Sequence, residues 1–409
     1  MLQRLHEQGK RACLVGGAVR DLLLGRKPKD FDVATDAHPE EVYELFRHCR
    51  LIGRRFRLAH VRMGREILEV ATFRAPHDEA EAHHEAQTEE NGRILRDNVY
   101  GSIEQDVWRR DFTVNSLYYD FATRSVIDYT GGVKDLQAGR LSLIGDSETR
   151  YREDPVRMLR AVRFAAKLGF HIDEPSRQAI LELHSLIEEA APARLFEEFL
   201  KLMHSGHALA CFRLLREYRL LGHLFPQTER HLSGAHGEVF EQFITRALEN
   251  TDKRIQRDLP VTPAFLIAVL LWEPVTQMQQ QEIDKGVAPV IALQRAAQII
   301  FHEQVRQVAI PRRFSTMVRE IWDLQGRFGR VRGKRIQRLA QHKRFRAAYD
   351  FLCLRSRAYP DKALAEQCRW WTDYQQSDAG KAARAAAEAN HKARPRRRRP
   401  PRKHRARHA

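Results

Sequence analysis

The sequence lacks the features of proteins that are held together by disulfides or zinc, that cross a membrane or that are secreted. Its 409 residues include only five cysteines, an odd number with no Cys-x-x-Cys spacing, which argues against a disulfide framework and against a zinc site. No apolar run approaches the roughly 20 residues of a membrane-spanning helix. The opening residues, MLQRLHEQGK, lack the apolar segment of a secretion signal. We therefore expect a cytoplasmic protein with no membrane span.

Acidic residues are also in short supply. The chain has 53 Asp and Glu against 70 Lys and Arg, a formal net charge of +17, so a polyanion is the expected partner. Residues 381–409 hold twelve Lys or Arg and one Glu, and the run RPRRRRPPRK at 394–403 is too charged and proline-broken to pack. This predicts a disordered tail that binds RNA phosphates without sequence preference. The alternative is a charged terminal segment that only increases the solubility of the protein. The expected RNA contacts are Arg394, Arg396, Arg397, Arg398, Arg399, Arg402, Lys403, Arg405 and Arg407.

The segment GGAVRDLLLGRKPKDFDVA at 16–34 carries the strongest chemical signal. Gly16-Gly17 follows a short apolar strand and lets the backbone turn tightly, so that bare N–H groups approach phosphate oxygens where a helix begins. Arg20 on that helix is a second candidate phosphate contact. On the next strand, the period of two places Asp30 and Asp32 on one face, where two carboxylates repel each other unless cations lie between them. A plain turn and a solvated loop end are the alternative, but both features within one short segment favour a metal-assisted nucleoside triphosphate site.

This segment resembles the head of the nucleotidyltransferases of the DNA polymerase β superfamily, in the branch of bacterial poly(A) polymerases and tRNA CCA-adding enzymes. That family has a GGxVRD-type helix start followed by DxD on the next strand. The resemblance continues in order through RRDFTVNSL at 109–117, DYTGGVKD at 128–135, EDPVRMLRAVR at 153–163 and PARLFEE at 192–198. Ordered blocks of this kind are far more specific than any one motif.

Within the family, LIGRRFRLAHV at 51–61 resembles the signature of the poly(A) polymerases, whereas CCA-adding enzymes usually carry a less basic segment. A basic edge strand is the alternative explanation of its alternating pattern. The resemblance implies template-independent addition of AMP from ATP to RNA 3′ ends, which promotes RNA turnover. CCA addition to tRNA is one alternative, and a non-catalytic RNA-binding protein on the same fold is another. RNA 3′ ends are the expected partner, with RNA-degradation machinery as a candidate second partner.

The resemblance also implies two-metal phosphoryl transfer, in which Asp30 and Asp32 bind two Mg²⁺ or Mn²⁺ ions. A third carboxylate should complete the cluster, and two candidates compete for that place. Asp111 ranks first because it lies in a family block. Glu69, on the strand at 67–71, is the second, because the superfamily often places its third acid on such a strand.

The nucleotide is expected to be held at both of its ends. Gly16, Gly17 and Arg20 are expected to hold the triphosphate of ATP, with Arg110 as a second cation. By resemblance, Asp154 and Arg157 recognise the base, with Arg160 and Arg163 in support. A spacing of three residues puts Asp154, Arg157 and Arg160 on one helix face, where a carboxylate acceptor and guanidinium donors can pair with a base edge. A helix cap with salt-bridging arginines is the alternative.

Periodicity and the family blocks together predict the fold class. An α+β nucleotidyltransferase head with a small mixed sheet is expected over residues 1–143, followed by a helical neck with base recognition over 144–205. A helical body and RNA-binding region follows over 206–375, and the disordered Arg-rich tail over 376–409. The polar stretch between Arg74 and Asp97 has no periodic apolar face and is expected to be a mobile loop beside the active site.

Overall fold

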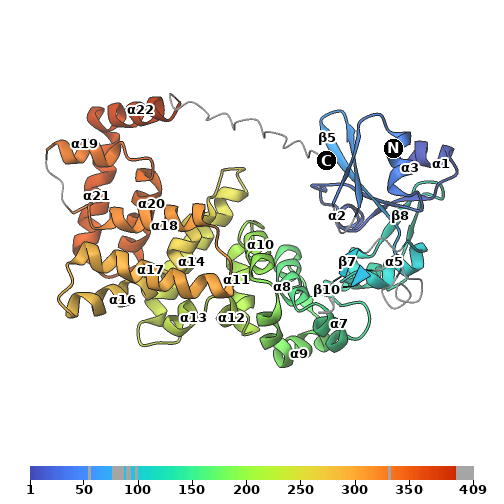
Figure 1. The fold of residues 1–409 in the computed structure, drawn as a ribbon, viewed down its shortest axis with the longest axis horizontal. Coiled ribbons are helices and arrows are strands. Elements are labelled where there is room, and N and C mark those ends of the chain that lie inside the picture. The colour runs from blue at the N-terminus through green and yellow to red at the C-terminus, as the bar shows by residue number, and fades with distance from the viewer. Residues whose placement is uncertain (54–56, 76–86, 89–93, 97–99, 330–332, 393–409) are drawn as a thin grey trace, which may run out of the picture. The chain divides into compact units, whose positions relative to one another are not determined.

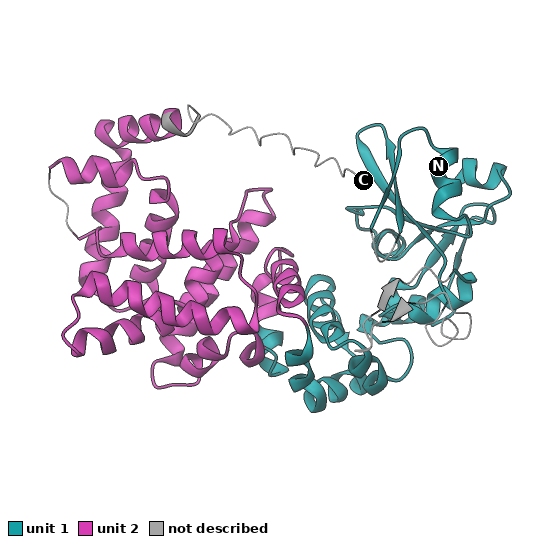
Figure 2. Ribbon diagram, viewed as in Figure 1, with its two compact units in different colours: residues 1–190, 213–220 teal, residues 191–212, 221–409 magenta. Residues whose placement is uncertain are grey.

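The computed structural model describes residues 1–53, 57–75, 87–88, 94–96, 100–329 and 333–392 (Figure 1). The arginines predicted to bind RNA at 394–407, and most of the predicted loop at 74–97, lie outside these residues. The chain divides into two compact units, residues 1–190 with 213–220, and residues 191–212 with 221–409 (Figure 2). The first contains the whole segment from the glycine turn to the predicted base-recognition block.

A seven-stranded mixed sheet forms the centre of the first unit, in the order β3-β4-β5-β2-β1-β8-β9. Its neighbours are antiparallel except for β2 and β5, which run parallel. The mixed sheet confirms the predicted α+β head, although the edge strand β3 was not predicted as a separate element. The strands are β1 (Ala12–Val15), β2 (Asp32–Thr35), β3 (Cys49–Ile52), β4 (Leu58–Met63), β5 (Glu66–Thr72), β8 (Tyr118–Asp120) and β9 (Ser125–Ile127).

Alternation along β2 separates the two faces of this sheet. Val33 packs into a core with Leu5, Val42 and Val61, whereas Ala34 packs on the opposite face in a core with Val107. Because side chains on a strand alternate, Asp32 shares the face of Ala34, at the exposed beginning of β2. The helices and small strands of this part are α1 (Leu2–Glu7), α2 (Gly17–Leu23), α3 (Pro39–Leu45), α5 (Ile103–Arg109), η1 (Thr113–Asn115), α6 (Gly132–Ala138), β6 (Gln87–Thr88) and β7 (Ile94–Arg96).

Two helices meet around Asp154-Pro155. The helix α7 (Ser147–Glu153) begins at Asp146, whose carboxylate accepts the backbone N–H of Thr149 at 2.9 Å. The helix α8 (Val156–Leu168) then begins after Pro155 and ends at Gly169, which has φ of +74°. The remaining elements here are β10 (Arg140–Leu141), β11 (His171–Ile172), α9 (Glu174–Leu183) and η2 (His184–Glu189).

From residue 191 onward every described element is helical, which confirms the predicted helical region. Buried aromatic rings fill its interior, for example Phe243 against Phe351 with ring centroids 5.4 Å apart. No helix among the described residues combines the length and apolarity that a membrane crossing requires. The helices are α10 (Pro192–Met203), α11 (Ala208–Glu217), α12 (Leu221–Leu224), α13 (Pro226–Leu232), α14 (Gly237–Ile255), α15 (Pro263–Leu270), α16 (Trp272–Asp284), α17 (Pro289–Gln307), α18 (Arg312–Gln325), α19 (Lys334–Ala340), α20 (Phe345–Ala358), α21 (Lys362–Gln376) and α22 (Asp378–Lys392).

The expected tail boundary at residue 376 is wrong. The helix α22 occupies residues 378–392, and Ala383 on it is buried in a core cluster with Trp371 of α21. The alanine-rich start of the tail therefore offers an apolar face that packs, and only the residues beyond it carry the dense arginine run.

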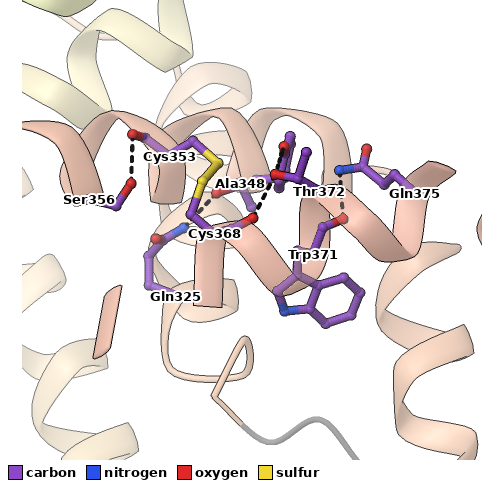
Figure 3. Close-up of a disulfide and its surroundings, with 9 residues drawn as sticks. Gln325, Ala348, Cys353, Ser356, Cys368, Trp371, Thr372 and Gln375 are labelled. Atoms are coloured by element: carbon purple, nitrogen blue, oxygen red, sulfur yellow. Dashed lines mark hydrogen bonds between the residues drawn. A yellow bond between two sulfur atoms is a disulfide. The ribbon is translucent and has the colours of Figure 1, made fainter. Parts of the chain in front are cut away.

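One disulfide joins α20 to α21, between Cys353 and Cys368 (Figure 3). The expectation that the cysteines would not pair is wrong at this position. The two residues are 15 apart in the chain, and the packing of neighbouring helices brings their Cα atoms to 5.3 Å. Spacing rules written for Cys-x-x-Cys motifs do not detect a pair created by tertiary packing. The other three cysteines, Cys13, Cys49 and Cys211, are free and buried.

Candidate active site

The glycine turn joins β1 to α2. Gly16 has φ of +72°, a conformation that side-chain-bearing residues rarely adopt, and its N–H donates to the carbonyl of Leu117 at 3.0 Å. A Cβ on Gly16 would lie 3.7 Å from Nη1 of Arg110 and 3.5 Å from the carbonyl oxygen of Asn115. The turn therefore lies directly against the RRDFTVNSL block, which is distant from it in the sequence.

Two predicted carboxylates face each other across neighbouring strands. Parallel pairing of β2 and β5 sets Asp32 opposite Glu69. Partial desolvation, and then the negative charges of Glu69 and Asp30, raise the pKa of Asp32, while Arg110 acts in the opposite direction. Asp30, Asp32 and Glu69 thus form one mutually repelling group, which a cation would relieve. His60 on β4 was missed by sequence reasoning, and its Nε2 lies 3.1 Å from Oε1 of Glu69.

These carboxylates fit Mg²⁺ in the way nucleotide enzymes bind it. Within the described residues, no three His, Cys, Asp or Glu side chains converge into a metal site by themselves. Mg²⁺ does not need such a cage, because it is usually held by one or two carboxylates together with water and the phosphates of the substrate. Besides desolvation, the charges of Glu69 and Asp30 raise the pKa of Asp32, and this repulsion is the observation that supports a cation here.

Asp111 lies in a different environment. Its Oδ2 accepts from Nε of Arg160 at 2.7 Å, and its Oδ1 accepts the backbone N–H of Phe112 at 2.8 Å. Burial alone would raise the pKa of Asp111. The charge and hydrogen bond of Arg160, and the hydrogen bonds from the Phe112 backbone and the Asn115 side chain, lower this pKa overall. The structure therefore pairs Asp111 with Arg160 of α8, and it is Glu69 that lies opposite Asp32.

Arg110 lies between the glycine turn and the carboxylates. Its Nε donates to the hydroxyl of Tyr118 at 2.7 Å, and its Nη2 donates to Asp106 at 3.0 Å. These bonds fix the guanidinium while Nη1 faces Gly16, and its charge acts on Asp32. This placement is the one expected of a phosphate-binding arginine.

Arg20 is placed differently from the prediction. The residue is only 2% exposed, its Nε and Nη2 donate to Asp21, and its Nη1 donates to Oδ1 of Asn115 at 2.5 Å. A buried guanidinium with these partners holds α2 against the block at 109–117 rather than reaching into solvent. Asn115 was missed as a contributor, although its position in RRDFTVNSL could have marked it.

The predicted base-recognition residues gather where α7 meets α8. Asp154 accepts the backbone N–H of Val156 at 3.2 Å, and Nη1 of Arg157 donates to the carbonyl of Arg150 at 2.6 Å and to Glu153 at 2.8 Å. Asp154 thus lies between the two helices and accepts the first backbone N–H of α8, and Arg157 is fixed against the end of α7. Both are half-buried at the junction.

Two further arginines support this junction. Arg150, which sequence reasoning missed, donates from Nη2 to the carbonyls of Arg109 and Arg110, at 3.1 and 2.6 Å. It thereby ties α7 to the end of α5. The Arg163 guanidinium lies 4.4 Å from the ring centroid of Phe164, which favours the supporting role expected for Arg163.

Comparison with known proteins gives consistent matches along the chain. Residues 12–142 match a family described as the poly A polymerase head domain, residues 169–232 match a probable RNA and SrmB-binding site of polymerase A, and residues 285–404 match a polymerase A arginine-rich C-terminus. Poly(A) polymerase I of Salmonella typhimurium is 50% identical over 92% of this chain and 82% of its own length. A CCA-adding enzyme of Lactobacillus helveticus is 36% identical over 54% of this chain and 53% of its own length. Among solved structures, an apo CCA-adding enzyme superposes with a TM-score of 0.61 at 20% identity, covering 92% of this chain and 81% of the other.

Proposed function

The chain belongs to the poly(A) polymerase I family, and from that premise we propose how its residues carry out the reaction of that family. The protein adds AMP from ATP to RNA 3′ ends without a template. Relatives with this activity in their names match 92% of the chain, whereas CCA-adding relatives match about half of it. One observation carries the proposal for the site: Asp32 lies opposite Glu69, and the charges of Glu69 and Asp30 raise the pKa of Asp32.

The proposed metal ligands are Asp30, Asp32 and Glu69. Asp111 ranked above Glu69 in the sequence, but its carboxylate is committed to Arg160 and the backbone of Phe112. Bound Mg²⁺, or Mn²⁺ in its place, would supply neutralisation of the charge that develops on the phosphates and activation of the RNA 3′ hydroxyl. His60, beside Glu69, orients that carboxylate.

The proposed nucleotide site spans the glycine turn and the α7–α8 junction. The backbone N–H groups at Gly16 and Gly17 and the fixed guanidinium of Arg110 bind the triphosphate. Asp154 and Arg157 bind the edge of the adenine base. Arg20 and Arg160 act as positioning residues, because both guanidinium groups are engaged by Asp21 and Asn115 or by Asp111.

The finer proposals rest on the family alone. They are Mg²⁺ as the working ion, a cytoplasmic location, RNA-degradation machinery as a downstream partner, and RNA contacts by the arginines of 394–407.

The test uses purified full-length protein, an unstructured RNA oligonucleotide, Mg²⁺ and one nucleotide at a time. We expect a ladder of AMP additions with ATP and little extension with CTP. Addition of C, C and then A to a tRNA lacking its end, with no ladder on the oligonucleotide, would instead support CCA addition. Asp32→Asn should abolish the ladder and leave RNA affinity unchanged, and a parallel loss of RNA affinity would contradict the assignment of Asp32 to the metals.

A further inference from the structure

A cavity of about 530 Å³ lies in the second unit, among α16, α17, α18, α20 and α21, and no residue of the proposed active site lines it. Its lining includes two largely buried tryptophans, several amide side chains and one half-buried arginine. The residues that matter here are Trp272, Gln294, Trp322, Asp323, Arg355 and Gln367. This combination of apolar lining with hydrogen-bonding groups is suited to a small ligand that has both apolar and polar parts.

Arg355 is the unusual member of this cavity. Its guanidinium lies 4.4 Å from the ring centroid of Trp272, and its Nη1 donates to Oε1 of Gln325 at 3.3 Å. Its Nε is buried and has no hydrogen-bond partner among the described residues, none of which forms an ion pair with Arg355. Burial lowers the pKa of Arg355 to about 10, although Tyr359, Asp361 and Glu273 act in the opposite direction. A desolvated cation without a carboxylate partner is costly, so an occupant that offers acceptor atoms would stabilise this arrangement.

A second cavity of about 310 Å³ shares Arg327 with the first. Arg335 and Arg338 of α19 line it together with His342. Both α19 arginines are exposed, and neither forms an ion pair or side-chain hydrogen bond with any described residue. Burial lowers the pKa of His342. The charge of Glu320 acts to raise this pKa, and the cations Lys343, Arg327 and Arg344 act to lower it further. Asp323 interacts with Arg327, but Arg335 and Arg338 have no carboxylate partner among the described residues. Two such guanidinium groups on one cavity form a candidate anion site, because guanidinium groups match phosphate geometry especially well.

We propose that these two cavities, which share Arg327, bind single-stranded RNA, with a phosphodiester group in the arginine-lined cavity and a nucleobase in the larger one. The assignment rests on the proposed function, which makes RNA the substrate. Asp323 lines the larger cavity and would repel a phosphate there, whereas its carboxylate can accept from a base amino group. Trp272 and Arg355, with ring centroid and guanidinium 4.4 Å apart, both line this cavity, and contacts of a base with such groups are tolerant of sequence, as an enzyme that extends many RNAs requires.

The first test is charge reversal in the arginine-lined cavity. Arg335→Glu with Arg338→Glu is compared with Arg257→Glu and Arg312→Glu, which change the net charge equally at exposed positions that line neither cavity. Affinity for a fluorescent unstructured RNA is measured by anisotropy over a salt series. If both arginines contact phosphates, the slope of the log–log salt plot should fall by about 1.4, at roughly 0.7 per phosphate. The control pair should change the slope less, and equal changes in the two pairs would overturn the site.

A second variant, Arg355→Gln, tests the larger cavity. Because Arg355 has no ion pair to lose and its desolvated charge is costly, the variant should keep or raise the melting temperature of the free protein and lose RNA affinity by about tenfold, the value of one charged hydrogen bond. A lowered melting temperature with unchanged RNA affinity would overturn the proposal by showing that Arg355 is only structural. Photo-crosslinking with 5-iodouridine RNA should mark the peptide that contains Trp272.

Two further measurements separate this inference from its premise and from a protein ligand. At saturating RNA, the arginine variants should extend RNA at the normal rate, whereas Asp32→Asn binds RNA and does not extend it. If wild-type protein binds RNA through these arginines but adds no AMP, the proposed function fails and the site stands. Polyglutamate is used as a competitor, and a failure to displace RNA supports the site. If the arginine variants lose polyglutamate binding but keep their RNA affinity, the proposal is overturned in favour of an acidic protein partner.

Discussion

Replacing Glu69 and Asp111 by their amides should change stability in opposite directions, and this contrast tests which of them belongs to the metal site. The folded-state pKa of Asp32 lies above its ordinary value, partly because of Glu69. Because the pKa of Asp32 is higher in the folded protein than in the unfolded chain, the free energy of unfolding falls as the pH rises through the folded-state pKa. At neutral pH the metal-free protein therefore carries the full cost of the ionised Asp32 beside Asp30 and Glu69. Glu69→Gln removes one of those charges. In the absence of metal, the variant should therefore be more stable than the natural protein.

The size of the effect follows from exposure. The Glu69 side chain is 53% exposed, so its repulsion of Asp32 is largely screened and is worth about 1 kcal/mol or less. That corresponds to a rise of roughly 2–4 °C in melting temperature for a unit of this size. The Asp111 side chain is only 10% exposed and accepts from Arg160. Asp111→Asn breaks a half-buried ion pair and should lower the melting temperature by more, at a cost of about 2 kcal/mol after allowance for the partly exposed arginine.

The assay is thermal unfolding with EDTA and with Mg²⁺ plus ATP, each without RNA. The natural protein and Asp111→Asn should both be stabilised by Mg²⁺ with ATP, whereas Glu69→Gln should lose most of that gain. Glu69→Gln should also reduce the rate of AMP addition by on the order of 10²-fold, comparable to the loss of one electrostatic contact to the transition state. If Asp111→Asn loses the metal-dependent gain and Glu69→Gln keeps it, the assignment of Glu69 is refuted.

Three further outcomes are expected elsewhere in the chain. Asp154→Ala and Arg157→Ala should weaken the preference for ATP over CTP in single-nucleotide extension, and an unchanged preference would place base selection elsewhere. Cys353→Ser should lower the melting temperature under oxidising conditions by an amount that corresponds to about 3 kcal/mol for a 15-residue loop, with no difference from the natural protein in dithiothreitol. Deleting residues 393–409 should flatten the salt dependence of RNA binding, with a slope change of roughly 0.7 per lost phosphate contact, and leave turnover at saturating RNA unchanged, since none of the proposed metal or nucleotide ligands lies there.

Local sequence pattern was sufficient for most strands of the seven-stranded sheet, although not for β3, and it could not decide between the two acidic candidates. The period of two along β2 correctly placed Asp32 on a face opposite Val33. Which strand would lie beside β2 depends on a long-range parallel pairing with β5, and that pairing is what brings Glu69 to Asp32. Asp111 ranked first because it lies in a family motif. A motif position, however, does not reveal that the Asp111 carboxylate forms an ion pair with Arg160 in the folded protein.

The same limit explains the arginines. Arg20 and Arg110 look alike in the sequence, since each adjoins an aspartate in a family block. In the structure Arg20 is buried against Asp21 and Asn115, whereas Arg110 is held by Asp106 and Tyr118 with one edge toward Gly16. Burial depends on which elements pack over a side chain, and no local pattern records it. The pairing of Cys353 with Cys368 escaped notice for the same reason.

The block at 109–117 connects the parts of the proposed site, and this has a consequence for selectivity. Arg110 faces the glycine turn, Asp111 binds Arg160 of α8, and Asn115 binds Arg20 of α2. Arg150 adds a fourth connection, from α7 to the carbonyls at the end of α5. In the proposed site, we expect a displacement of the α7–α8 junction by a wrongly sized base to be transmitted to Arg110, the proposed phosphate contact. Because reacting groups must be held to within a fraction of an ångström, we expect base recognition to change the rate of transfer as well as binding.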